Sequence, residues 1–429
     1  MSRLIKLARA ASVGVLGAVV ALAACETTNN VLTAPPPLTP VNAIFTSYVA
    51  IGNSITAGYQ SGGINDSTQR ASYARLLAAA MNTTYRYPSL AMPGCGAPIA
   101  NALTGALVTT GVPAGTPQLP CYGRTFAMDT SEILTNVAVP GARTYDPYNV
   151  STPSTNTLTQ LILKGQTQVS QALRAKPTFA SVWIGNNDVL VAGLTGLLVP
   201  FGSVSPGIVS TQAQFQARYD SMMTQLTAGA PGLKGVLIGV AKVQYLPSLS
   251  QGGLIAGSAA IKAGINQAAG TTVTVLPNCT NSTSLINVPQ LLIAIKKYVA
   301  NNADPAGHPP VISCDPATSA PYPAPVGNIF VLDPNEQTTL NTAIDGYNNY
   351  ISAKANTLGF AYYDPNVLFA AKRTNGEIPG FPNFASGTAT FGNLISLDGV
   401  HPTAAAHLLV AQGIAGVINL KYGTNLVVQ

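Results

Sequence analysis

Apolar runs with the length of β-strands alternate with helix-like stretches along most of this chain. The strand-like runs lie at about 44–51, 178–184, 235–241, 328–333 and 360–364. The helix-like stretches lie at about 72–81, 157–175, 211–228 and 336–357. Strands joined through helices form parallel sheets, and both faces of such a sheet are covered. The alternation therefore predicts an α/β fold, a three-layer sandwich in which a mostly parallel sheet lies between two layers of helices.

The stretch from 336 to 357 is the best-marked helix. Asp333, Pro334 and Glu336 stand at the positions of an N-cap, a first helical residue and a capping-box partner. Apolar residues then recur at helical spacing from Leu340 to Ile351. This pattern predicts an amphipathic helix that buries one face.

A serine follows the first strand-like run. That run ends at Gly52, and Ser54 comes two residues later. The end of a strand is where an open α/β sheet places its chemistry. The stretch is not the Gly-x-Ser-x-Gly elbow of the α/β-hydrolases, because Thr56 stands where the second glycine would be. Ser54 is the candidate nucleophile.

The candidate base lies near the other end of the chain, in Asp398-Gly399-Val400-His401-Pro402. An acid three residues before a histidine can hold one imidazole nitrogen while the other faces a cleft, which is the arrangement of a general base. Pro402 suits the first position of the Ala-rich helix that follows. The chain has 3 histidines. We expect His407 to be a packed or surface residue of that helix, and His308 to be solvated in a Pro-rich loop.

Four motifs that occur in order resemble those of the SGNH (GDSL-type) hydrolase family. They are Gly52-Asn53-Ser54-Ile55-Thr56-Ala57-Gly58, Asn136-Val137-Ala138-Val139-Pro140-Gly141-Ala142, Gly185-Asn186-Asn187-Asp188 and the stretch from Asp398 to Pro402. Each motif alone could be an ordinary turn or the start of a helix, whereas four in order are specific. Asn53 departs from the family pattern, which has aspartate there. Asparagine keeps the acceptor and the turn preference but loses the charge.

The resemblance implies a flavodoxin-like SGNH-hydrolase fold and a set of roles. Ser54 would attack an ester carbonyl, His401 would take its proton, and Asp398 would orient the imidazole. The oxyanion hole would consist of the backbone N–H groups of Ser54 and Gly141 and the side-chain amide of Asn187. Neither a metal nor a cofactor is expected.

Gly235–Val240, followed by Tyr245–Pro247, is similar to the longer lipase and esterase branch of that family. The function expected is that of a serine esterase or lipase cleaving carboxylic esters through an acyl-enzyme. The alternative within enzymes is an O-acetyl esterase acting on carbohydrate or cell-wall esters. A further alternative is a surface-binding lipoprotein that keeps the fold without turnover.

The N-terminus has the pattern of an export signal. Arg3, Lys6 and Arg9 precede an apolar run that ends at Ala24 and is short for a membrane span. The end of this run and Cys25 resemble the bacterial lipoprotein box, which predicts a signal peptide at 1–24 and lipid on Cys25; a plain signal peptide is the alternative. Glu26 rather than aspartate favours the outer membrane. Residues 25–42 are Pro-rich and predict a tether, which leaves 43–429 as the hydrolase domain.

Cysteine count and charge agree with an exported enzyme. Apart from Cys25, four cysteines remain, and an even set in an exported chain suggests two disulfides. Proximity favours Cys95 with Cys121 and Cys279 with Cys314, although four cysteines allow three pairings and free thiols are an alternative. Only 8% of residues are charged and the net charge is +6, to which the signal contributes. No charged tail is present, so a nucleic-acid partner is not expected.

Two long segments, about 86–130 and 245–327, exceed the minimal fold. Loops of this length are functional or form elements of their own. They could wall or cover the cleft, or they could be structural insertions. The apolar run from Val288 to Val299 would suit an acyl-chain site and would equally suit core packing.

Overall fold

The computed structural model describes residues 38–109, 121–125, 132–149, 158–200, 208–300, 309–315, 330–385 and 387–429. Backbone contacts divide the chain into Met1–Thr39 and a compact unit, Pro40–Gln429. All elements named below belong to the second unit. Cys25, with its predicted lipid, and His308 lie outside the described residues.

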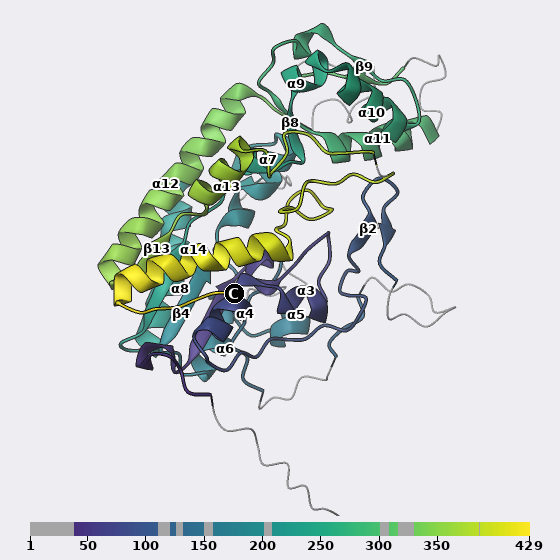
Figure 1. Cartoon of the computed structure of the whole chain (residues 1–429). Coiled ribbons are helices and arrows are strands. Elements are labelled where there is room, and N and C mark those ends of the chain that lie inside the picture. Colours follow the sequence, from purple (N-terminus) through teal and green to yellow (C-terminus); the bar gives the residue numbers. More distant parts are fainter. Residues whose placement is uncertain are drawn as a thin grey trace, which may run out of the picture. The chain divides into compact units, whose positions relative to one another are not determined.

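A parallel sheet forms the centre of this unit (Figure 1). Its strands are β1 (Tyr48–Gly52), β4 (Phe179–Trp183), β7 (Lys234–Ile238) and β13 (Ala361–Tyr363), in that order across the sheet. Asn136 forms a parallel bridge with Ala50 and so adds a short segment on the outer side of β1. Counted along the chain, the order across the sheet is 2-1-3-4-5, which is the flavodoxin-like order.

Helices cover both faces, because successive strand residues point to opposite sides and both sets are apolar. One face packs against α6 (Gln168–Arg174), α8 (Gln212–Gly229) and α12 (Pro334–Leu358). The other face packs against α4 (Tyr73–Ala80) and α14 (Ala404–Tyr422). The predicted three-layer α/β sandwich is therefore confirmed. The helix α12 has the predicted capping box between Asp333 and Glu336.

By length and composition α14 could cross a membrane. It instead contacts α4 and β13, and its buried residues, such as Val410 and Ile414, lie in the apolar cluster on that face of the sheet. The apolar character of α14 is thus that of a core helix.

Three predicted elements differ from the structure. The run at 328–333 contains β12 (Val331–Leu332), which is not in the central sheet but pairs antiparallel with β10 (Leu285–Asn287). The helix predicted at 157–175 is two helices, α5 (Leu158–Leu163) and α6, because the backbone turns left-handed at Lys164 and Gly165, with φ of 51° and 75°. The C-terminal helix begins at Ala404 with Thr403 as its N-cap, and not at Pro402.

The segment predicted as the second insertion folds together with a smaller antiparallel sheet, which consists of β8 (Leu249–Gln251), β10 and β12. The helices α9 (Gly252–Gly257), α10 (Ala259–Ala269) and α11 (Val288–Ala300) lie together there (Figure 1). Leu291, Leu292 and Ile295 of α11 are buried in a local apolar cluster. Of the two uses open for this helix, core packing is the one observed.

Two disulfides join the cysteines that are near in sequence, Cys95 with Cys121 and Cys279 with Cys314. Each lies in one of the two long segments. The remaining elements are α2 (Ser54–Ala57), α3 (Asp66–Arg70), α7 (Leu190–Thr195), α13 (Pro365–Thr374), β2 (Ile99–Asn101), β3 (Ala106–Leu107), β5 (Val199–Pro200), β6 (Ile208–Val209), β9 (Thr274–Val275), β11 (Val311–Ile312) and the 3₁₀ turns Ala43–Phe45, Asn186–Asp188, Val243–Tyr245 and Pro277–Cys279.

Candidate active site

The sheet topology determines where a site can form. The chain leaves β1 toward the Asn136 segment on one side, and it leaves β4 toward β7 on the other side. The loops at the carboxyl ends of β1 and β4 therefore diverge and leave a crevice, the usual ligand position in open α/β sheets. Ser54 follows β1, and Asn187 follows β4.

Ser54 is held at the start of the short helix α2. Asn53 caps this helix, because its side-chain oxygen accepts a hydrogen bond from the Ile55 N–H at 3.1 Å. Ser54 is the first helical residue, so its own N–H has no intrahelical acceptor. Gly52 permits the tight turn, because a Cβ there would lie 2.2 Å from Thr56 Oγ1 and 2.8 Å from the Trp183 carbonyl oxygen.

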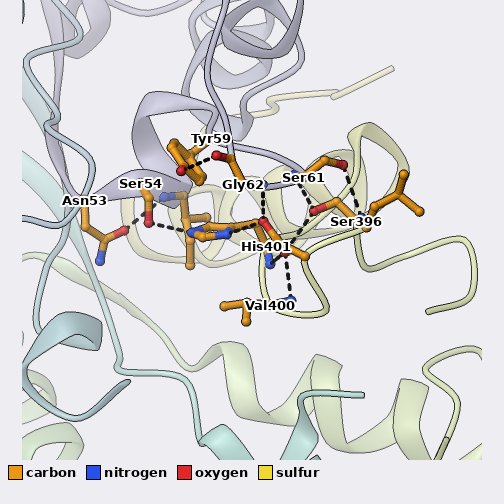
Figure 2. A network of polar contacts seen from close by, with 11 residues as sticks. Asn53, Ser54, Tyr59, Ser61, Gly62, Ser396, Val400 and His401 are labelled. Carbon is orange, nitrogen blue, oxygen red and sulfur yellow. Dashed lines mark hydrogen bonds and ion pairs between the residues drawn. The ribbon is translucent and has the colours of Figure 1, made fainter. Parts of the chain in front are cut away.

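Ser54, His401 and Asp398 form a continuous hydrogen-bonded row (Figure 2). Ser54 Oγ lies 2.9 Å from His401 Nε2, and His401 Nδ1 lies 2.8 Å from Asp398 Oδ2. The side chains of His401 and Asp398 are only 14% and 12% exposed. The structure thus brings together the three residues that the two terminal motifs predicted, from positions 347 residues apart in the case of serine and histidine.

Both oxygens of the Asp398 carboxylate accept hydrogen bonds in addition to the contact with His401 Nδ1. Oδ2 accepts from the Gly62 N–H at 2.7 Å, and Oδ1 accepts from the N–H groups of Val400 at 2.9 Å and His401 at 2.8 Å (Figure 2). The Ser396 hydroxyl donates to Oδ1 at 3.2 Å. Burial alone raises the pKa of Asp398, but the His401 charge and the hydrogen bonds from His401 and Val400 outweigh it and lower the pKa to about 2. The carboxylate is therefore ionised at neutral pH and can hold the Nδ1 proton of His401.

Tyr59 is a site residue that the sequence did not single out. Its ring packs against the His401 imidazole, and its hydroxyl donates a hydrogen bond to the Gly62 carbonyl (Figure 2). Burial, and then the Asp398 charge, raise the pKa of Tyr59 to about 12, so the phenol stays neutral. An aromatic residue directly after Gly58 was the one available signal, and no spacing rule connects it with His401.

Gly141, Asn187 and Asp188, from the other two motifs, lie in two loops that hydrogen bonds join to each other. Asn187 Nδ2 donates to the Ala142 carbonyl at 2.9 Å, beside Gly141, which is exposed and has a left-handed φ of 81°. The buried Asp188 carboxylate accepts from the N–H and hydroxyl of Thr144 at 2.9 and 2.8 Å. These bonds fix the loop after β4 to the loop that carries Gly141.

Asn53 makes a contact that aspartate could not make. Its Nδ2 donates to Asn186 Oδ1 at 3.3 Å, while its oxygen caps α2. An ionised carboxylate is only an acceptor. With asparagine at position 53, the site lacks the charge of the family's aspartate but gains a hydrogen bond that joins the loops after β1 and β4.

His407 is packed rather than exposed. It is fully buried, and its Nδ1 accepts a hydrogen bond from the Tyr73 N–H at 3.2 Å. Burial, with a smaller contribution from the His401 charge, lowers its pKa to about 3. The imidazole is therefore neutral at ordinary pH and lies outside the Ser54 row.

An apolar cleft opens at Ser54 and His401. Its empty volume, including the open mouth, is about 640 Å³. Asn186 and Asn187 are among its lining residues, and most other lining side chains are apolar: Ile55, Leu190, Val243, Leu246, Phe369, Ile378, Ile395 and Val400. Of the two long segments, the second supplies Tyr245 and Leu246, whereas no described residue of 86–130 lines this cleft.

Comparisons with known proteins agree with the motifs. Residues 48–414 match the family model "GDSL-like Lipase/Acylhydrolase". Similar solved structures include an extracellular lipase from Streptomyces rimosus, with 17% identity over 88% of this chain and 99% of that one and a TM-score of 0.32. An acetylxylan esterase from Geobacillus stearothermophilus has 11% identity over 89% and 95%, with a TM-score of 0.35.

A phospholipase A1 from Streptomyces albidoflavus has 16% identity over 87% of this chain and 98% of that one, with a TM-score of 0.29. A search among curated proteins finds no match. The family match covers most of the chain, including the motifs around Ser54 and His401. The chain therefore belongs to the GDSL-like lipase/acylhydrolase family and is a carboxylic ester hydrolase.

Proposed function

We propose that this hydrolase works through an acyl-enzyme on Ser54. The Ser54 hydroxyl donates to His401 Nε2, which takes the proton as the oxygen attacks the ester carbonyl. Asp398 holds Nδ1–H and stabilises the imidazolium that results. His401 then protonates the departing alcohol. Water, activated by the same imidazole, attacks the acyl-enzyme and releases the acid.

The developing oxyanion would be stabilised by the N–H groups of Ser54 and Gly141 and by Asn187 Nδ2. The support is that all three belong to loops at the carboxyl ends of β1, its neighbouring segment and β4. Asn187 donates to a carbonyl beside Gly141 in the free enzyme, so a small rotation of its amide would redirect one N–H to substrate. Such donors act most strongly where water is excluded.

The cleft supports an apolar acyl group rather than an acetylated glycan. Its walls consist mainly of Leu, Ile, Val and Phe side chains, which give hydrocarbon burial but few partners for sugar hydroxyls. Lys242 is the only lysine or arginine among the described residues that line the cleft, and it is ion-paired with Asp345 at 2.7 Å. The apolar lining is the single observation that carries the proposed substrate class.

Hydrolysis of p-nitrophenyl esters from acetate to palmitate tests this proposal. We expect kcat/KM to rise by about threefold or more per two added methylenes until the cleft is filled, because apolar burial contributes up to about 0.8 kcal/mol per methylene. Ser54→Ala should remove this turnover. A profile confined to acetate, with acetate release from acetylated glycan, would favour the O-acetyl esterase instead.

We also propose that the protein is exported and anchored through lipid on Cys25. The support is the apolar run before Cys25 and the two disulfides, a bond type that persists in oxidising compartments. In cells, Cys25→Ser should move the protein from the membrane fraction to the soluble fraction. Equal membrane association of both forms would contradict the anchor.

A further inference from the structure

A tight backbone turn lies beside Asp398. The Gly63 N–H donates to the Gln60 carbonyl at 3.0 Å, which closes a turn of four residues. Its two central residues, Ser61 and Gly62, have φ of 53° and 73°. Left-handed φ at both central positions defines a type I′ turn. Glycine suits such a position, whereas a residue with a Cβ rarely adopts it, so the serine calls for an explanation.

This turn is hydrogen-bonded to the loop that carries the acid (Figure 2). The Gly62 N–H donates to Asp398 Oδ2 at 2.7 Å, and the Ser61 N–H donates to Ser396 Oγ at 2.8 Å. In return, Ser61 Oγ accepts from the Leu397 N–H at 3.2 Å. The hydroxyl of Ser61 therefore binds the chain directly before Asp398, which explains a serine at a position that costs backbone strain.

Ser396 holds the carboxylate from the other loop, and its side chain is buried, with the residue 6% exposed. The Ser61 N–H can only donate to Ser396 Oγ, so the hydroxyl keeps its own hydrogen for Asp398 Oδ1, 3.2 Å away. The Ser396 N–H donates to the His401 carbonyl at 2.8 Å and so closes the loop from 396 to 401. One residue thus contacts the turn, the acid and the far end of the loop.

The first of the two long segments lies against the back of the turn. The Ile99 N–H donates to the Ser61 carbonyl at 2.6 Å. A Cβ on Gly63 would lie 2.3 Å from the Gly96 carbonyl oxygen, so the two segments are in direct contact. The turn cannot withdraw from Asp398 without breaking these contacts.

We propose that Ser396 and Ser61 are positioning residues for Asp398. The Ser396 hydroxyl fixes the direction of the carboxylate, and the Ser61 hydroxyl fixes the chain before it. The carboxylate then holds the His401 imidazole in line with Ser54. Neither serine is among the described residues that line the cleft, so their effect passes through the acid and not through substrate. This inference rests on the proposed function, because it concerns the acid of the proposed mechanism.

The test follows labelling of Ser54 by a fluorophosphonate probe, because a stoichiometric reaction can be followed even in slow variants. Ser396→Ala should lower the labelling rate constant, and kcat for p-nitrophenyl butyrate, by about fivefold to twentyfold, since it removes a hydrogen bond to a charged group. KM should stay within about twofold, because substrate contacts are intact. A loss confined to KM would overturn the inference.

Ser250→Ala is the matched control. It also removes a buried serine hydroxyl, but the Oγ of Ser250 has no hydrogen-bond partner among the described residues. This variant should label and hydrolyse at the rate of the wild type. Equal losses in Ser250→Ala and Ser396→Ala would show a general response to a changed interior and would overturn the inference.

The same substitution in an Asp398→Ala background separates positioning from disruption of the fold. If Ser396 acts through Asp398, Ser396→Ala should change the labelling rate constant by less than about twofold once the carboxylate is gone. An equal fall in both backgrounds would overturn the inference.

Ser61→Gly decides the question if Ser396→Ala does not fold. Glycine readily adopts the left-handed φ of 53°, so this variant keeps the turn and removes only the hydroxyl. It should lower the labelling rate constant by about twofold to fivefold, and by less in the Asp398→Ala background. An unchanged rate would then overturn the inference.

The outcomes separate this inference from the proposed function. Ser54-dependent hydrolysis with equal rates in Ser396→Ala and the wild type overturns only the positioning role. Absence of any Ser54-dependent labelling and hydrolysis overturns the proposed function, and the positioning role with it.

Discussion

The Tyr59 ring packs against the His401 imidazole, with ring centroids 4.8 Å apart and ring planes inclined at 55°. The contact limits the rotation of the imidazole while Asp398 holds Nδ1. Tyr59→Ala should lower kcat by about 2–10-fold, because an aromatic pair contributes about 0.5–1.5 kcal/mol. Tyr59→Phe keeps the ring and should stay within twofold of the wild type by about the same reasoning. Equal kcat values for the alanine and phenylalanine variants would show that the ring does not position His401.

The hydrogen bond from Asn53 to Asn186 leads to a prediction about position 53, where the family pattern has aspartate. Asn53→Asp keeps the cap on the Ile55 N–H and loses the bond to Asn186, so Ser54-dependent hydrolysis should persist within about tenfold. Asn53→Ala also loses the cap, and it should reduce the free energy of unfolding by about 1 kcal/mol more than Asn53→Asp does. Urea unfolding and ester kinetics measure the two effects. An inactive aspartate variant that remains folded would show that the asparagine amide is required.

Asn187 should affect the chemical step more than binding. Asn187→Ala removes a donor proposed for the oxyanion, and kcat should fall by about 10²–10³ with little change in KM. Asn335→Ala, at an exposed position near the start of α12, is the matched control and should not change kcat. A loss confined to KM would move Asn187 from the oxyanion hole to ground-state binding.

His407 predicts a specific sensitivity to acid. The folded protein holds its pKa at about 3, below the ordinary value of 6.5, so between these values the unfolded chain binds a proton that the folded chain does not. Its contribution to stability is therefore complete above pH 6.5 and is lost as pH falls toward 3. From pH 7 to pH 5 the wild type should lose about 2 kcal/mol more of its free energy of unfolding than His407→Gln does. Parallel losses in both proteins would contradict a neutral, buried imidazole.

The central layer of the fold was predictable, because it follows from local patterns. The runs ending at Gly52, Trp183 and Ile238 are apolar on both faces, as buried parallel strands require, and the capping box at Asp333 marks α12 directly. Ser54 and His401 were predictable for a related reason. Each lies within one of the quoted motifs, and the structure brings Ser54 Oγ to 2.9 Å from His401 Nε2.

The remaining features depend on contacts between segments far apart in the sequence. β12 is as apolar as a central strand, and only its pairing with β10 places it in the smaller sheet. The contact of Tyr59 with His401 and the hydrogen bond from the Gly62 N–H to Asp398 arise when the C-terminal loop folds onto the loop after α2. No spacing rule within one segment contains that information.

The identity of the nucleophile is the central claim, and covalent labelling measures it most directly. A fluorophosphonate probe, followed by peptide mapping with mass spectrometry, should modify one serine, Ser54. Ser54→Ala should not be labelled, and His401→Ala should be labelled far more slowly, because the base that activates the hydroxyl is lost. Label on a different serine, or no label on a folded protein that hydrolyses esters, would contradict the mechanism proposed for this site.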